Sequence, residues 1–203
     1  MTKTIKAVDF SVAGYQQTVD RLLQLMQQRL MVQHDVARWK WNQKSPIEAP
    51  RREQELLAKA RQQGMTYGLD PDAVNAFFQW QIEAGKLIQT VDFQNWQRKG
   101  ARSFANVPSL NRTLRPLLDK LDTELLSVLA TLAPTLDCPM VQEQTKSAAQ
   151  LVYVDAAGIE NREEYDYGYC KVGQRFSALK SGNKESAKKH PCLNWKGVKL
   201  KLF

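Results

Sequence analysis

Residues 12–42 carry apolar side chains at helical spacing, and this long uninterrupted pattern limits the fold more than any other feature of the chain. Val19, Leu22 and Met26 follow steps of three and four residues, and no proline breaks the stretch. The pattern predicts a single long helix. This helix is expected to end before Pro46, because the residue that precedes a proline is disfavoured in the helical conformation.

The next two helical segments are shorter and have recognisable ends. A second helix is expected from about residue 48 to residue 63, because Gly64 is a common type of helix end. The third begins at Asp70 and Pro71, since an aspartate can accept from the first free amides and a proline suits the first helical position. Its apolar pattern continues through Ile88.

The remaining patterns are also helical. A fourth helix is expected to start at Ser109 or Asn111 and to end at Pro134, and a further one is expected over about residues 140–156. No stretch of any length alternates in the manner of a strand. The predicted fold class is therefore all-α, a helical bundle with one long N-terminal helix.

The excess positive charge lies in the C-terminal part of the chain. The chain has 29 basic and 21 acidic residues, and nine of the basic residues but only one acid lie after residue 170, which leaves 20 of each in residues 1–170. This division predicts a helical domain over residues 1–160 and a basic extension over residues 161–203. The extension is expected to be solvated or loosely docked.

The composition also argues against two classes of protein. No apolar run approaches the roughly 20 residues that a membrane-spanning helix needs, so no membrane span is expected. The three cysteines lack CxxC spacing and the two histidines lie far apart in the sequence, so no metal site is predicted.

Two cations interrupt the apolar pattern of the first predicted helix. Arg29 and Lys40 lie eleven residues apart, which is close to three full helical turns, so both point in the same direction. A charge buried without a partner costs several kcal/mol. The pattern therefore predicts an anionic ligand between the helices.

Other polar positions favour the same interpretation. Gly85 leaves space on the third helix, and Gln89 places an amide one turn later. Arg52 lies near the start of the second helix and Arg115 lies early in the fourth. Any one of these cations would more often extend to solvent along its aliphatic stem. Together they predict a pocket for a small dianion.

In this order the residues resemble the AroQ-type chorismate mutases. The resemblance rests on the stretches Arg38-Trp39-Lys40-Trp41, Ser45-Pro46-Ile47-Glu48 and Gly68-Leu69-Asp70-Pro71, and on the spacing from arginine over eleven residues to lysine and twelve more to arginine. The chain length and the Arg115 segment resemble the exported gamma subclass, in which one chain supplies a whole active site.

The resemblance implies the rearrangement of chorismate to prephenate, in the branch that leads to phenylalanine and tyrosine, without a cofactor. It implies that Arg29 and Arg115 bind one substrate carboxylate and that Arg52 binds the other. Bidentate pairs of this kind would hold the flexible substrate in a reactive shape.

The resemblance also assigns the reacting atoms. Lys40 and Gln89 would be the catalytic residues that donate to the ether oxygen, where negative charge builds in the transition state. Glu53 would accept from the ring hydroxyl. Because a glutamine donates at any pH, the activity is expected to be flat from mildly acid to mildly alkaline conditions.

Two positions depart from the family pattern. Ala49 stands where many relatives have an aspartate, so only its backbone amide could contact substrate. Gly85 stands where relatives often have a small hydroxyl residue that contacts a carboxylate. Both changes are expected to lower affinity without removing Lys40 and Gln89.

Location and assembly depend on the resemblance alone. Cys138 and Cys170 match the place where exported relatives can have a disulfide, and the resemblance implies a periplasmic or secreted protein. A homodimer is also expected. The chain starts with methionine and shows no signal sequence. A cytoplasmic form is the alternative.

Two other functions stay open at this point. An isochorismate-pyruvate lyase would use the same fold and a similar cationic pocket, although the Arg115 segment favours the mutase. A non-catalytic helical protein could use its basic extension to bind nucleic acid or an anionic membrane. That alternative gives no reason for Arg29 and Lys40 in a core pattern, so we expect no nucleic-acid partner.

Overall fold

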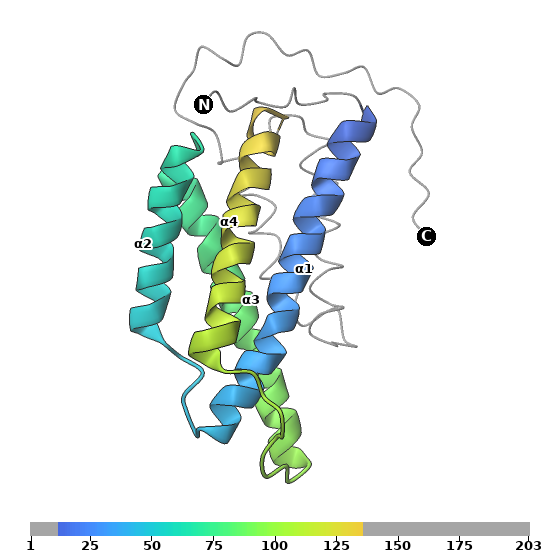
Figure 1. Cartoon of the computed structure of the whole chain (residues 1–203), viewed down its shortest axis with the longest axis vertical. Helices are drawn as coiled ribbons and strands as arrows, with labels where there is room; N and C mark the ends of the chain where they lie inside the picture. Colours follow the sequence, from blue (N-terminus) through green and yellow to red (C-terminus); the bar gives the residue numbers. More distant parts are fainter. Residues whose placement is uncertain (1–11, 136–203) are drawn as a thin grey trace.

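The computed structural model describes residues 12–135, which form four long helices packed side by side (Figure 1). The helices are α1 (Val12–Asn42), α2 (Pro50–Thr66), α3 (Pro71–Arg98) and α4 (Arg115–Leu132). Successive helices run in opposite directions, and α1 and α3 extend beyond α2 at one end of the bundle. Within the described residues there is no strand, so the all-α prediction and the long first helix are confirmed.

Several predictions fall outside these residues. They concern the helix over residues 140–156, the Cys138–Cys170 disulfide, and the division of the chain at residue 160.

Helix α2 does not end at Gly64, and that prediction is wrong. Gly64 is buried inside the helix, and a Cβ atom there would lie 2.8 Å from Cγ2 of Val74 on α3. The glycine therefore allows α2 and α3 to approach closely. The chain turns only after Thr66, at Gly68, where φ is +72°.

The other helix starts agree with the chemistry of their residues. The carboxylate of Asp70 accepts from the amide of Ala73 at 2.8 Å, as expected for the cap of α3. Ser109, one of the two candidate starts of the fourth helix, accepts from the amide of Arg112 at 3.3 Å. One π-helical turn, Leu110–Leu114, then precedes α4, and a short 3₁₀ turn that contains Pro134 follows it.

The apolar core fills one half of the bundle. It is formed by buried side chains from all four helices, which include Val19, Leu22, Leu25, Met26, Ala60, Val74, Phe78, Leu125, Leu126 and Leu129. A second, small cluster of Val36, Leu110 and Leu114 lies farther along α1. Buried polar residues lie between the two clusters on α1, so the fold itself separates an apolar region from a polar one.

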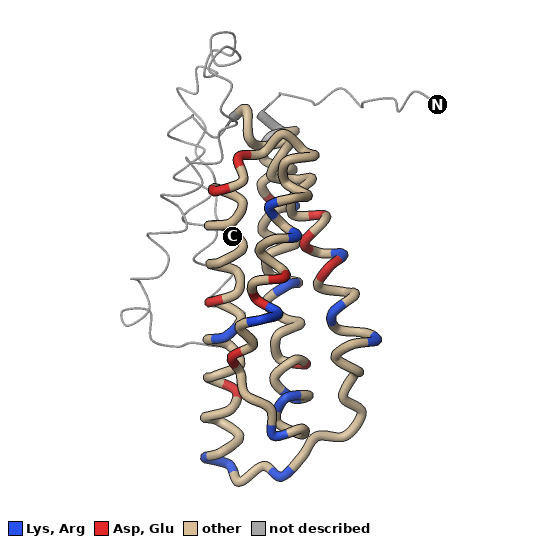
Figure 2. The backbone as a smooth tube through the Cα atoms, turned by 90° about the vertical axis from the view of Figure 1, so that its left-hand side faces the viewer, with Lys and Arg blue, Asp and Glu red and all other residues tan. Residues whose placement is uncertain are grey.

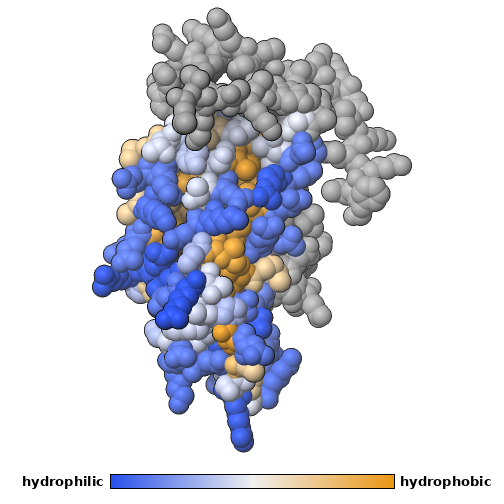
Figure 3. Space-filling view, in the orientation of Figure 1, coloured by the Kyte–Doolittle hydropathy of each residue, from blue (hydrophilic) through white to orange (hydrophobic). Residues whose placement is uncertain are grey.

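The surface is predominantly hydrophilic. Figure 3 shows a narrow apolar seam between hydrophilic residues on one face. Figure 2 shows basic and acidic residues next to one another near the middle of the bundle. None of the helices in the described part of the chain is long and apolar enough to cross a bilayer.

Candidate active site

Side chains from all four helices converge on one pocket beside the polar half of α1. Five cations line it, namely Arg29, Lys40, Arg52, Lys86 and Arg115, together with a single carboxylate, Glu53. Its other polar side chains are Gln33, Gln81 and Gln89. The excess of cations favours a ligand with more than one negative charge.

The structure places most of the predicted site residues at this pocket. The residues that line it are Arg29, Lys40, Ala49, Arg52, Glu53, Gln89 and Arg115. Gly85 is buried on α3 but faces the side chain of Gln33 instead of the pocket. Cys138 and Cys170 lie outside the described residues.

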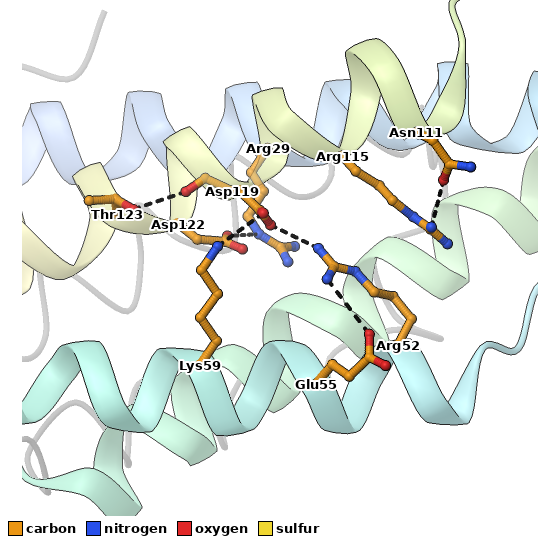
Figure 4. A network of polar contacts seen from close by, with 9 residues as sticks. All are labelled: Arg29, Arg52, Glu55, Lys59, Asn111, Arg115, Asp119, Asp122 and Thr123. Carbon is orange, nitrogen blue, oxygen red and sulfur yellow. Dashed lines mark hydrogen bonds and ion pairs between the residues drawn. The ribbon is translucent and has the colours of Figure 1, made fainter.

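Arg29 already has an anionic partner within the protein. Its Nε donates to Asp122 on α4 at 2.7 Å (Figure 4). A terminal nitrogen donates to the backbone carbonyl of Gln81 at 3.1 Å. Arg29 is 2% exposed. The burial of Arg29 alone therefore does not require an external anion, contrary to the argument from the sequence. Asp122 was not predicted, although an acid among the leucines of α4 carries the same signal as Arg29.

Arg52 is also paired, but near the surface. One of its terminal nitrogens lies 2.8 Å from Asp119 on α4, and Lys59 approaches the other oxygen of that carboxylate at 3.0 Å (Figure 4). Its neighbour Arg51 points away, with 95% of its side chain exposed. The two adjacent arginines therefore have different surroundings, since 30% of the Arg52 side chain is exposed.

Lys40 and Arg115 have no carboxylate partner among the described residues. Lys40 donates to the backbone carbonyl of Ile47, and Arg115 donates to the side-chain oxygen of Asn111 at 2.6 Å. Burial lowers the pKa of Lys40 from 10.5 to about 8, and the nearby Arg115 contributes to this shift, while Glu53 opposes it. An incoming anion could therefore bind these two cations without displacing an acid.

Lys86 is a pocket cation that the sequence analysis missed. Its ammonium lies 3.2 Å from Glu48, 3.4 Å from Glu53 and 3.0 Å from Glu83. Burial by itself would lower the pKa of Lys86, but the three carboxylates outweigh it and raise that pKa. Because Glu83 lies one turn before Lys86, the sequence suggests an ordinary surface pair.

Glu53 and Ala49 bind each other at the start of α2. One oxygen of Glu53 accepts from the backbone amide of Ala49 at 3.0 Å, in the manner of a capping box. The amide of Ala49 is therefore already paired, so it is not free to replace the aspartate that many relatives carry there.

Gln89 donates to another glutamine. Its Nε2 lies 2.8 Å from Oε1 of Gln33 on α1, and both side chains are buried. Gln33 was not predicted as a site residue. The side-chain oxygen of Gln89 has no partner among the described residues.

The pocket can bind and polarise an anion with its own side chains. Ammonium, guanidinium and amide groups provide donors on several sides. Within residues 12–135, no three His, Cys, Asp or Glu residues lie close enough to hold a metal ion.

Comparison with known proteins agrees with this geometry. Residues 18–90 match the family of chorismate mutase type II. The secreted chorismate mutase of Mycobacterium tuberculosis is 33% identical over 100 residues, which cover 49% of this chain and 50% of that protein. The secreted chorismate mutase of Mycolicibacterium smegmatis is 26% identical over 125 residues, which cover 62% of this chain and 68% of that protein.

Solved structures of chorismate mutases have a similar fold. The crystal structure of chorismate mutase from Burkholderia thailandensis superposes with a TM-score of 0.62 and 28% sequence identity, over 80% of this chain and 98% of that one. The chain spans about half the length of its Mycobacterium tuberculosis relative. The matched segment contains Arg29, Lys40, Arg52 and Gln89. On this evidence residues 18–90 match the chorismate mutase type II family, and the helical body of the chain is similar in fold to solved chorismate mutases.

Proposed function

We propose that the chain catalyses the rearrangement of chorismate to prephenate in this pocket. The observation that carries the proposal is the convergence of Lys40 and Gln89, from α1 and α3, on a pocket that Arg52 and Arg115 also line. Two relatives that are similar to part of this chain are named as secreted chorismate mutases.

The arginines would bind the two carboxylates of the substrate. Arg115 would turn from the neutral oxygen of Asn111, and Arg52 would exchange Asp119 for a substrate carboxylate. Arg29 donates to Asp122 and to a backbone carbonyl, and its guanidinium keeps further N–H groups that can face the ligand. Held at both ends, the substrate would be confined to the shape that reacts.

Lys40 and Gln89 would act on the reacting ether. In a concerted rearrangement one carbon–oxygen bond breaks while one carbon–carbon bond forms, so neither a proton nor an electron donor is needed. Negative charge builds on the ether oxygen as its bond to carbon lengthens. Fixed donors at that oxygen stabilise the transition state, and loss of one commonly costs about 10²-fold in rate.

Glu53 would accept from the ring hydroxyl. One of its oxygens is engaged by the Ala49 amide and the other lies 3.4 Å from Lys86. A carboxylate has about four acceptor sites, so these contacts leave capacity for a hydroxyl group.

The first experiment follows the loss of chorismate absorbance with purified protein and with a Lys40→Ala variant. We expect activity in the parent and a collapse of kcat in the variant, while the helical circular dichroism stays unchanged. Lys120→Ala, which removes an exposed lysine of α4 outside the pocket lining, is the control and should keep parental activity. A parent without activity on chorismate that releases pyruvate from isochorismate would instead identify a lyase.

We also propose that the protein is exported and forms a homodimer. The support for export is that both relatives reported above are named as secreted. Fractionation of the native host, followed by immunoblotting, tests the location, and the protein is expected outside the cytoplasm. Light scattering on the full chain tests the assembly, and a mass of about 23.2 kDa would exclude the dimer.

A further inference from the structure

The surface of α3 at Gly85 is in close contact with the side chain of Gln33. A Cβ atom at Gly85 would lie 3.0 Å from Cδ and 3.1 Å from Cγ of Gln33, which is closer than side chains normally approach. Gln33 therefore occupies the space that a larger residue at position 85 would need. It is 6% exposed and lines the pocket.

Gln33 connects a backbone carbonyl to Gln89 through contacts that have a direction. Its Nε2 faces the carbonyl of Arg29 at 3.5 Å, a long contact, and its Oε1 accepts from Nε2 of Gln89 at 2.8 Å. A carbonyl can only accept, so the nitrogen of Gln33 faces Arg29 and its oxygen faces Gln89. Gln89 must then turn its own nitrogen toward Gln33, because the reverse orientation would oppose two oxygens.

Among residues 12–135, no other hydrogen bond selects the orientation of the Gln89 side chain. Its Oε1 is buried and has no hydrogen-bond partner among the described residues. The hydrogen bond to Gln33 therefore decides which end of the amide is available as a donor.

We propose that Gln33 is a positioning residue for the rearrangement and that Gly85 provides the space in which it acts. One N–H of Gln89 stays on Gln33, and the second is left for the ether oxygen of the substrate. The inference rests on the proposed role of Gln89.

The kinetic test replaces Gln33 with residues that keep its length. Gln33→Met removes the acceptor, and we expect kcat to fall about tenfold with KM changed less than twofold. Gln33→Glu retains an acceptor, so kcat should recover to within about twofold of the parent. KM should rise in this variant, because the new carboxylate repels the dianion. Gln79→Met is the matched control, because it removes a glutamine amide that lies outside the pocket lining and donates to Glu83 at 2.9 Å.

A double-mutant cycle shows whether Gln33 acts through Gln89. In a Gln89→Ala background, Gln33→Met should change kcat less than twofold, because the group that it positions is absent. The same tenfold loss in both backgrounds would overturn the inference, as would parental kcat in Gln33→Met alone.

NMR spectroscopy tests the positioning of Gln89 without depending on enzyme activity. In ¹⁵N-labelled protein, Gln33→Met should shift the side-chain NH₂ resonances of Gln89 and speed their exchange with solvent, while those of Gln79 stay in place. Gly85→Ala should cause the same shift, because the new methyl group displaces the flexible end of Gln33. Unchanged Gln89 resonances would overturn the inference even if the parent proved active. An inactive parent would overturn the proposed function, but it would not alter the resonance shifts expected here.

Discussion

The two halves of α1 are buried equally well but by different means. Val19, Leu22 and Met26 are at most 3% exposed and pack against apolar side chains. Arg29 and Lys40 are 2% and 9% exposed, yet they lie among polar groups. The same helical spacing therefore produces an apolar core at one end and a charged pocket at the other.

The difference lies in what each half requires of its neighbours. An apolar side chain is stabilised by any close packing, since the hydrophobic effect has no direction. A buried cation needs an acceptor at a defined distance, such as Asp122 at 2.7 Å from Arg29. The polar half should therefore be less tolerant of the loss of a single partner, and it should carry the activity.

The largest expected effect is the removal of the acid beside Arg29. Asp122→Ala leaves a buried guanidinium without its charge partner, and such changes cost about 3–5 kcal/mol of unfolding free energy. Urea unfolding followed by circular dichroism measures it. The double variant Arg29→Met, Asp122→Leu should recover most of the loss, because both charges leave together. A loss below about 1 kcal/mol in Asp122→Ala would mean that this half tolerates an unpaired charge after all.

A cavity in the apolar half should be costly without affecting the chemistry. Leu125→Ala removes a fully buried side chain of the core and should cost about 3 kcal/mol of unfolding free energy. The kcat of the protein that remains folded should stay at the parental value, measured well below the melting temperature. Leu117→Ala, at an exposed position of α4, is the control and should cost under about 0.5 kcal/mol. A changed kcat in Leu125→Ala would show that the two halves are coupled.

Removal of the Lys40 ammonium group from the pocket should stabilise the folded protein. The pKa of Lys40 is lowered from 10.5 to about 8, so the folded state disfavours its charge at neutral pH. Lys40→Met should therefore raise the unfolding free energy by about 2 kcal/mol at pH 7 and remove the activity; the estimate allows about 1 kcal/mol for the lost hydrogen bond to Ile47.

The pH dependence of stability checks the sign of this effect. Between about pH 8 and 10.5 the unfolded state binds more protons at Lys40 than the folded state does, so parental stability should gain on the variant as pH rises through this window. If the variant instead became still more stable relative to the parent as the pH rises, that result would contradict the lowered pKa of Lys40.

The smallest expected effect concerns the pH dependence of activity. The sequence predicted a flat profile from Gln89 alone, but a free-enzyme pKa of about 8 for Lys40 changes the expectation. The value of kcat/KM should fall by up to about tenfold per pH unit above pH 8, as the ammonium loses its proton. The value of kcat should stay flat, because a bound dianion favours the charged lysine. Lys40→Arg keeps its charge, so a declining kcat/KM in that variant would assign the effect to another group.

The sequence was sufficient to predict helix ends that are set by residues close to them in the sequence. Residue spacing predicted the C-terminal end of α1 at Asn42, and Asp70 caps α3 as its position suggested. Gly64 misled the prediction because its lack of a side chain serves the contact with Val74, which is a matter of tertiary packing.

At the candidate site, the sequence predicted which cations are buried better than it predicted which acids pair with them. The spacing placed Arg29 and Lys40 on the buried face of α1, but Asp122 lies 93 residues after Arg29, and no local rule connects them. Lys86 was missed because it pairs with Glu83 at a spacing typical of exposed helices. Contacts between distant segments are thus the part that required the structure.

Asp119 pairs with both Arg52 and Lys59, so it would compete with a ligand for Arg52. When Arg52 turns toward a ligand, Asp119 stays paired with Lys59, so the exchange strands no carboxylate. A monovalent anion such as chloride offers Arg52 no more than Asp119 already provides. A molecule whose several anionic groups match the spacing of several cations should displace the internal acid better than a monovalent anion, so we expect the protein to select its ligands by valence and geometry.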